Sequence, residues 1–230
     1  MNVAIIAAAG QGTRLGGKLA KQFLELAGVP VIIHTLRKFE QCAAIHEVVV
    51  VLPAPESAGF LQLASKYELR KLARVVPGGR TRAESVWQGL QSVRAATAGI
   101  IAVHDAVRPF VTTEEIERTV RAAELSGAAI LAAPVIDTIK EIENGRVVRT
   151  LERTRLRRAL TPQCFRFELL RRAFEQSPEL VASATDDSSL VESLGATVTL
   201  VEGDARNIKI TRPEDIALAE IILESLESGV

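Results

Sequence analysis

The chain has 230 residues, 47% of them hydrophobic and 4% aromatic, and its 28 Lys and Arg residues balance its 28 Asp and Glu residues. This length and composition exclude a disordered chain and predict one α/β domain over residues 1–230. Because the formal net charge is zero, we expect no nucleic acid or membrane partner, and any anion-binding site must be local.

Membrane, export and metal-binding signals are weak throughout the sequence. The longest apolar run, Gly127 to Ile136, is about half of the roughly 20 residues that a membrane-spanning helix needs. The first predicted strand begins at Val3, which leaves no room for a charged leader before it, so we expect a cytoplasmic protein. Cys42 and Cys164 lack metal-ligand spacing, and we expect both to be reduced packing residues.

A glycine loop with the sequence AAAGQGTRL follows the first predicted strand, Val3 to Ala8. Such a loop exposes backbone N–H groups where the strand ends, and Arg14 and Lys21 add positive charge beside it. Donors and cations together are typical of a phosphate site. The alternative is a tight turn in which the glycines only permit positive φ.

The hydrophobic pattern that follows alternates between helices and strands. Predicted helices span residues 30–41, 56–67, 113–126, 166–176 and 188–194, and another opens at the second glycine turn, 78–82. Predicted strands span residues 48–52, 73–76, 100–103, 128–135, 197–201 and 207–210. The last helix is expected to start with a capping box of Thr211 and Glu214.

This alternation predicts a mainly parallel sheet with helices on both faces, in which ligands collect at the carboxyl ends of the strands. Both glycine turns and Asp105 fall at such ends. Residues 137–153 break the pattern, because they are polar and carry Asn144 and Gly145 between two extended segments, which indicates a β-hairpin arm. Since a lone ribbon is marginal in water, we expect the arm to pack on a second copy of the chain; a solvated surface hairpin is the alternative.

Three phosphate-binding motifs compete for the first loop. A dinucleotide fingerprint needs a glycine where this chain has Leu15, and an acidic residue where it has residues 53–55, Pro-Ala-Pro. A P-loop needs Ser or Thr after Lys18, where this chain has Leu19. The remaining possibility is a nucleotidyltransferase loop, whose glycines wrap a nucleoside triphosphate and whose Arg and Lys neutralise it.

Seven segments, in order, resemble the family of 2-C-methyl-D-erythritol 4-phosphate cytidylyltransferases. They are AAAGQGTRL with AKQF, GGRTRAESV, VHDAVRPF, LAAPVIDTIK, RALTPQCF, ATDDSS and NIKITRPEDI. The resemblance implies a Rossmann-like three-layer nucleotidyltransferase fold and a homodimer formed through the hairpin arm. It also implies a magnesium-dependent reaction of CTP with 2-C-methyl-D-erythritol 4-phosphate, which gives the CDP-alcohol and pyrophosphate in isoprenoid precursor biosynthesis.

The resemblance also implies roles for individual residues. Arg14 and Lys21 would contact the triphosphate and stabilise the transition state. The chemistry agrees, because a phosphate oxygen is already an anionic nucleophile and needs positioned cations rather than a base. The nucleotide would be bound by backbone groups and one hydroxyl, at Ala8, Ala9, Gly10, Gly12, Gly79 and Ser85.

The second substrate and the metal would use other residues. Asp105 at a strand end could hold Mg²⁺ against phosphates, or it could cap the next turn. The polyol phosphate would be bound by Arg108, Thr161 and Lys209 of one subunit and by Thr138 and Arg153 of its partner. We expect structural roles for the three histidines, His34, His46 and His104, and for the loop residues Asp186 and Asp187.

Two rival functions remain open. The first is a cytidylyltransferase for another polyol phosphate, such as ribitol 5-phosphate, because it would share the loop, Arg14 and Asp105. The second is a nucleotide-sensing subunit that keeps the fold without turnover. Its expected mark is the loss of Lys21 or Asp105, and the sequence retains both.

Overall fold

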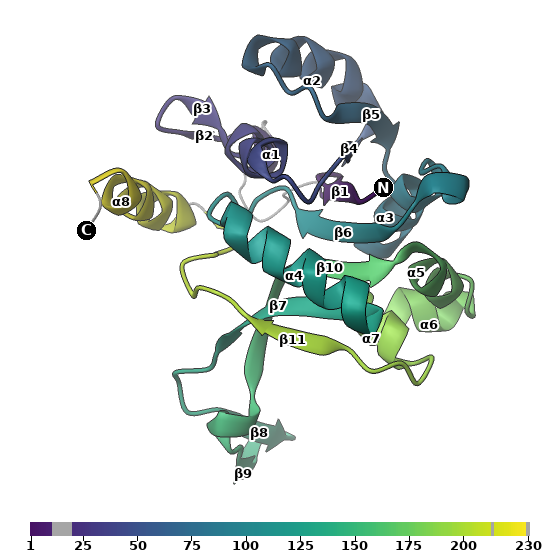
Figure 1. Cartoon of the computed structure of the whole chain (residues 1–230). Coiled ribbons are helices and arrows are strands. Elements are labelled where there is room, and N and C mark those ends of the chain that lie inside the picture. Colours follow the sequence, from purple (N-terminus) through teal and green to yellow (C-terminus); the bar gives the residue numbers. More distant parts are fainter. Residues whose placement is uncertain (11–19, 213, 229–230) are drawn as a thin grey trace.

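A seven-stranded sheet forms the centre of the computed structural model, which describes residues 1–10, 20–212 and 214–228 (Figure 1). The strands run in the spatial order β11 (Thr199–Glu202), β7 (Ala128–Pro134), β10 (Arg157–Arg166), β6 (Ile100–Asp105), β1 (Val3–Ala7), β4 (Glu47–Leu52) and β5 (Leu72–Pro77). β10 is antiparallel to both of its neighbours, whereas the other paired strands are parallel. The mainly parallel α/β sheet predicted from the sequence is confirmed.

Helices cover both faces of the sheet because strand side chains alternate between the faces. Ala4 and Ile6 of β1 pack in one buried cluster, while Val3 and Ile5 pack in another. The first cluster includes side chains of α1 (Val31–Gln41), α2 (Ser57–Ala64) and α4 (Thr113–Ser126). The second includes side chains of α3 (Arg82–Gln91), α5 (Phe167–Phe174) and α7 (Asp187–Glu192). The result is the expected three-layer arrangement.

Smaller elements complete the described chain. They are α6 (Pro178–Ser183), α8 (Glu214–Ser228), the ribbon of β2 (Glu25–Leu26) and β3 (Val29–Pro30), and the 3-10 turns Lys21–Phe23, Ala54–Glu56, Ser65–Tyr67, Ala95–Thr97 and Arg153–Arg155. In Figure 1, α8 lies beside the β2–β3 ribbon, and the two share a third apolar cluster. Within the described residues, no helix is both long and apolar enough to cross a membrane.

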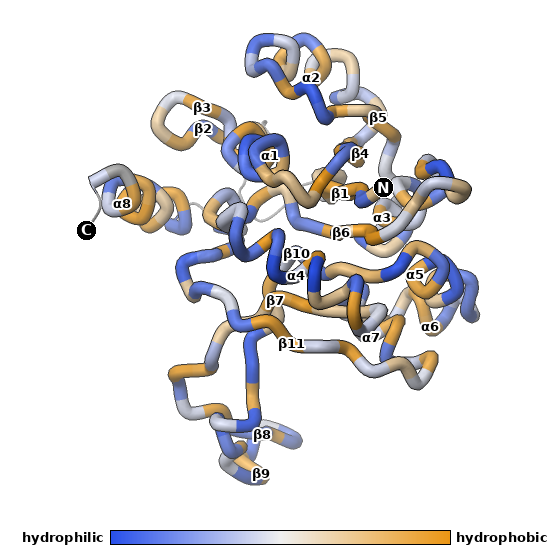
Figure 2. The backbone as a smooth tube through the Cα atoms, in the orientation of Figure 1, coloured by the Kyte–Doolittle hydropathy of each residue, from blue (hydrophilic) through white to orange (hydrophobic). Residues whose placement is uncertain are grey.

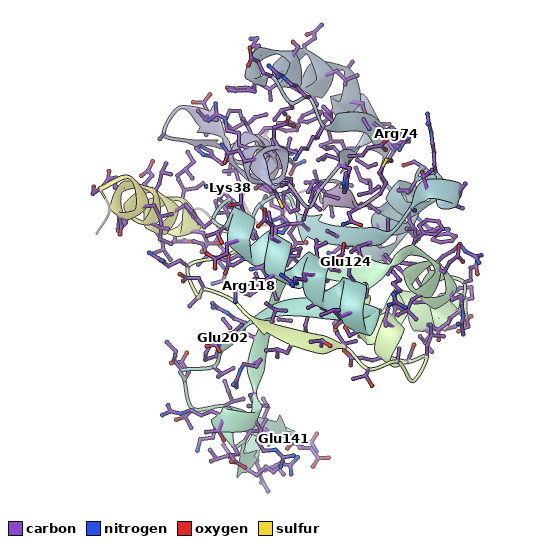
Figure 3. The ribbon with its side chains drawn as sticks, viewed as in Figure 1. Lys38, Arg74, Arg118, Glu124, Glu141 and Glu202 are labelled. Atoms are coloured by element: carbon purple, nitrogen blue, oxygen red, sulfur yellow. The ribbon has the colours of Figure 1, made fainter. Side chains whose placement is uncertain are left out.

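Local sequence signals explain where α4 begins and ends. Thr112 and Glu115 form a capping box, in which each side chain accepts a hydrogen bond from the backbone N–H of the other residue. The helix ends at Gly127, whose φ of 93° is strained for any residue with a side chain. Figure 3 shows α4 next to β11, and the Arg118 side chain donates to the Glu202 carbonyl across that contact.

One strand has no counterpart among the predicted elements, and two expectations about local structure are wrong. The strand is β10, in which Pro162 interrupts the pattern and whose pairing with β7 shifts register between Ala159 and Gln163. Residues 207–210 form an irregular segment rather than a strand. At the start of α8, the carboxylate that accepts from the Thr211 backbone N–H and hydroxyl belongs to Asp215 rather than to Glu214.

The predicted hairpin is present as β8 (Lys140–Glu143) and β9 (Arg146–Thr150), which project away from the sheet (Figure 1). Asn144 and Gly145 adopt positive φ values of 49° and 74°, as an Asn-Gly turn requires. Figure 2 shows hydrophobic residues interspersed with hydrophilic ones along the arm. The exposed fractions of Ile142 and Val147, 67% and 62%, leave apolar surface uncovered in the single chain.

Candidate active site at the carboxyl edge of the sheet

A cavity of about 350 Å³ lies where β1, β5 and β6 end. Its lining includes Ala8, Ala9 and Gly10 after β1, Gly79 after β5, Ser85 in α3, Asp105 at the end of β6, and the side chains of Lys21 and Lys209. The structure therefore brings together eight residues predicted from the sequence to bind nucleotide, metal or phosphate. Arg14 and Gly12, which belong to the same prediction, lie outside the described residues.

The two glycine turns are pressed against each other at the wall of this cavity. A Cβ on Gly78 would lie 2.3 Å from the Cβ of Ala9, closer than any two such atoms can approach. A Cβ on Gly10 would lie 3.6 Å from Cε of Lys21, which places the lysine chain beside the first loop. The Gly79 N–H donates to Oγ of Ser85, so this amide is directed at the hydroxyl.

Asp105 is the centre of charge of the site. Its carboxylate is 2.9 Å from Nζ of Lys209 and 3.3 Å from Nε of Arg108, both measured to Oδ2, and its Oδ1 is 3.1 Å from Nε of Arg82. Burial alone would raise the pKa of Asp105, but the three cations outweigh burial and hold this pKa well below its usual range. Asp105 is therefore an anion at every physiological pH.

Arg82 is a residue of this site that sequence reasoning missed. Its guanidinium lies between two carboxylates, those of Asp105 and Asp187. The distance from Nη1 of Arg82 to Oδ2 of Asp187 is 2.9 Å, and the Asp187 side chain is 1% exposed. Burial lowers the pKa of Arg82, but the two aspartates outweigh burial and raise it. Arg82 occurs within the motif GGRTRAESV, and its place at the start of a helix beside a glycine turn was the available signal.

A second cavity of about 250 Å³ adjoins the first. The two share Arg82, Asp105 and Lys209, and the second adds Arg108 and Thr161 to its lining. Three predicted ligands of the polyol phosphate thus come together from three separate segments of one chain: Arg108, Thr161 and Lys209.

The remaining two predicted ligands, Thr138 and Arg153, lie near the base of the arm. Both side chains are exposed, and Nη1 of Arg153 donates a hydrogen bond to the Ile136 carbonyl. Neither residue is among those that line the two cavities. Their predicted role requires a second subunit.

His104 is fully buried behind Asp105 and bridges the segments of the second cavity. Its Nε2 lies 3.1 Å from the Arg108 carbonyl, and its Nδ1 lies 2.9 Å from Oγ1 of Thr161. Burial lowers the pKa of His104 to about 4, so the ring is neutral near pH 7. A carbonyl can only accept, so Nε2 carries the proton and Nδ1 accepts from the Thr161 hydroxyl.

The other two histidines also contact the backbone, as expected of structural residues. Nε2 of His34 lies 2.9 Å from the Leu26 carbonyl, and Nδ1 of His46 accepts from the Asn2 N–H. Cys42 and Cys164 are free and buried, as predicted.

Of the carboxylates at this edge of the sheet, that of Asp105 fits a magnesium position. Mg²⁺ is commonly held by one or two carboxylates together with substrate phosphates, and Asp105 offers one carboxylate at the junction of the two cavities. Asp186 caps α7 by accepting from the Ser189 N–H, and Asp187 pairs with Arg82, so both stabilise their loop as expected. Among the described residues, no group of three or more His, Cys, Asp or Glu side chains forms a metal site.

Comparison with known proteins identifies the family. The sequence profile of 2-C-methyl-D-erythritol 4-phosphate cytidylyltransferase matches residues 2–225. The chain is 44% identical to the protein of that name from Pelotomaculum thermopropionicum over 96% of this chain and 94% of the relative. It is 42% identical to the protein of that name from Bacillus licheniformis, over 96% and 95% of the two chains. The chain belongs to the 2-C-methyl-D-erythritol 4-phosphate cytidylyltransferase family.

Solved structures give the same result. The 4-diphosphocytidyl-2C-methyl-D-erythritol synthase of Anaerococcus prevotii superposes with a TM-score of 0.84 at 31% identity, covering 97% of this chain and 98% of the other. The 2-C-methyl-D-erythritol 4-phosphate cytidylyltransferase of Thermus thermophilus superposes with a TM-score of 0.77 at 35% identity, covering 96% and 98%. The family resemblance inferred from the seven motifs is thereby confirmed.

Proposed function

We propose that this protein transfers the cytidylyl group of CTP to 2-C-methyl-D-erythritol 4-phosphate, releasing pyrophosphate and forming 4-diphosphocytidyl-2-C-methyl-D-erythritol. The observation that supports the proposal is the pair of adjoining cavities that share Asp105, Arg82 and Lys209. One cavity lies between two glycine turns that offer backbone groups, and the other collects Arg108 and Thr161. Two phosphorylated substrates therefore have separate places that meet at one cationic boundary.

The chain's own groups fit this reaction without a catalytic base. A phosphate oxygen of the polyol forms the new bond to the α-phosphorus, and the bond from that phosphorus to the bridging β-phosphate oxygen breaks. Negative charge gathers around the α-phosphate, where Lys21 and Lys209 line the nucleotide cavity. Positioned cations stabilise such charge most strongly in a site that excludes water. We assign the same role to Arg14, which lies outside the described residues.

Magnesium is part of the proposal. When bound, it would neutralise phosphate charge and polarise the α-phosphate, and Asp105 would hold it. Because three cations already surround this carboxylate, we expect Mg²⁺ to bind together with nucleotide, whose phosphates draw the cations away. Asp105→Asn should raise the magnesium concentration needed for half-maximal turnover. Lys21→Ala should lower turnover by the same factor in this variant as in the wild type.

We further propose a homodimer in which the arm of one subunit supplies Thr138 and Arg153 to the site of the other. The exposed pair Ile142 and Val147, which face each other across the β8–β9 ribbon, supports a contact with a second chain. Mixing two inactive variants tests the sharing directly. A Lys21→Ala subunit and an Arg153→Ala subunit form one intact site in each mixed dimer, so random exchange restores about a quarter of full activity.

Subunits that each use their own Arg153 would restore nothing on mixing, and that result would refute the shared site. Sedimentation gives an independent measurement, because a fully active monomer would also refute it.

Pyrophosphate release decides the main proposal. The protein is incubated with CTP and Mg²⁺, and with either 2-C-methyl-D-erythritol 4-phosphate or ribitol 5-phosphate. The proposed function requires a kcat/KM for the first alcohol that exceeds that for the second by at least about tenfold. Preference for ribitol 5-phosphate would reassign the substrate. CTP binding with no pyrophosphate release from either alcohol would indicate a nucleotide-sensing protein.

A further inference from the structure

One buried residue, Asn207, connects three of the segments that line the second cavity, through its backbone carbonyl and its side chain. The backbone carbonyl of Asn207 accepts a hydrogen bond from Nη1 of Arg108 at 2.9 Å, and Nδ2 of Asn207 donates one to the Thr161 carbonyl at 2.9 Å. Two residues further along the same segment comes Lys209, which reaches Asp105. Asn207 therefore contacts two of the three residues predicted to bind the polyol phosphate and lies two positions before the third.

The segment that carries Asn207 pairs with the sheet only at its first residue, where the Gly203 N–H donates to the Ala132 carbonyl of β7 at 2.8 Å. Residues 203–210 follow β11 as irregular chain, and separate hydrogen bonds hold each end. The Asp204 N–H donates to Oε1 of Glu115 at 2.7 Å, and the Ile210 N–H donates to the Val107 carbonyl at 2.9 Å. Between these two bonds, two contacts link the segment to β10: the Asn207 side chain donates to the Thr161 carbonyl, and the Arg158 side chain donates to the Ala205 carbonyl at 3.0 Å. The contact of Asn207 is the buried one of the two.

Asn207 is also poorly explained by stability alone. It is 0% exposed, and within the described part of the chain its Oδ1 has no hydrogen-bond partner. A buried acceptor without a partner destabilises a fold, and an apolar residue of the same shape avoids this loss. The amide donates to the Thr161 carbonyl, which points to a role in geometry.

We propose that Asn207 is the positioning residue of the polyol phosphate cavity, fixing Arg108, Thr161 and Lys209 relative to one another. It acts through these residues and does not line either cavity. The inference rests on the proposed function, since it concerns the site for the second substrate. Lys209 lines both cavities, but most of the nucleotide cavity comes from other segments, namely the two glycine turns and Lys21, so the effect of Asn207 falls mainly on the alcohol.

The test measures steady-state kinetics and thermal unfolding of two variants. Asn207→Ala removes the amide, and Asn207→Asp keeps its shape while presenting the Thr161 carbonyl with an acceptor. Both should raise the KM for 2-C-methyl-D-erythritol 4-phosphate by about tenfold or more and change the KM for CTP by less than about threefold. Asn2→Ala is the matched control, because Asn2 is a buried, hydrogen-bonded asparagine that directly precedes β1, at the end of the strand away from the cavities.

The control should unfold at a lower temperature and keep both KM values. An Asn207→Asp protein with wild-type kinetics would overturn the inference, because packing alone would then suffice. So would equal losses for CTP and the alcohol, or failure of both variants to fold, since Asn207 would then serve folding. Failure of the proposed function is a separate outcome, visible as absence of pyrophosphate release by the wild-type protein.

Discussion

The buried His104 predicts that the protein loses stability on mild acidification. Its ring is 0% exposed, and its two nitrogens contact the Thr161 hydroxyl and the Arg108 carbonyl. Protonation would place a charge there, and Nδ1 could no longer accept from Thr161. The unfolded chain has no such restriction, so it takes up a proton at higher pH than the folded chain.

The size of the effect follows from the two pKa values of His104. The unfolded value is 6.5 and the folded value is about 4, a difference worth about 3 kcal/mol when fully expressed. Because the folded pKa is the lower one, the unfolded state binds the extra proton between these values. The free energy of unfolding therefore falls as pH falls from 6.5 toward 4. Between about pH 7.5 and about pH 5, this amounts to about 2 kcal/mol.

Urea unfolding of the wild type and His104→Gln across this range measures the effect. Glutamine keeps an N–H that can face the Arg108 carbonyl but does not titrate, so the variant should lose about 2 kcal/mol less than the wild type on acidification. Burial also lowers the pKa of His34, which acts with the same sign in both proteins and cancels in the comparison. Parallel losses in the two proteins would refute the reasoning about His104.

Three further substitutions probe the site. Lys21→Ala should lower kcat by about 10²–10³ with little change in thermal unfolding, because its charge acts on the transition state. Gly78→Ala should raise the KM for CTP by about tenfold, since its Cβ would force the two glycine turns apart, whereas Gly59→Ala, with open space around it, should not. Arg82→Gln should lower the free energy of unfolding by about 3 kcal/mol in urea titrations, because it leaves the buried Asp187 without its cation.

The fold was largely predictable because most of its elements are specified by local sequence. The helix at residues 113–126 has its apolar stripe within the segment and its cap and terminal glycine directly beside it, at Thr112 and Gly127, and the structure has α4 at those residues. β10 lacks such a local signal. Pro162 lies within it, and its place between β6 and β7 is fixed by pairing with strands far away in the sequence. Tertiary contacts that no local pattern encodes determine this strand.

The same distinction separates the predicted site residues from those that were missed. Lys21 and Asp105 follow strands and carry charge, so their positions at the carboxyl edge of a parallel sheet could be read directly. Arg82 and Asn207 act through partners distant in sequence: Arg82 through Asp187, and Asn207 through Thr161. Their motifs were recognisable, but their roles depend on hydrogen-bonded geometry that only the folded chain provides.

The arrangement around Asp105 explains why one carboxylate can serve two anionic substrates. Arg82, Arg108 and Lys209 carry three positive charges around Asp105, while Asp187 pairs with Arg82 and Asp186 lines the second cavity, so cations and carboxylates balance there at three each. Without Asp105, these cations would repel one another at close range in a partly buried site. With Asp105 present, the three cations are held near the positions that two phosphates require. The hydrogen bond from Arg108 to the Asn207 carbonyl holds the segment of Lys209 beside Arg108. Asp105 therefore organises the cations in the free protein, and the proposed magnesium would bind there together with the substrate phosphates.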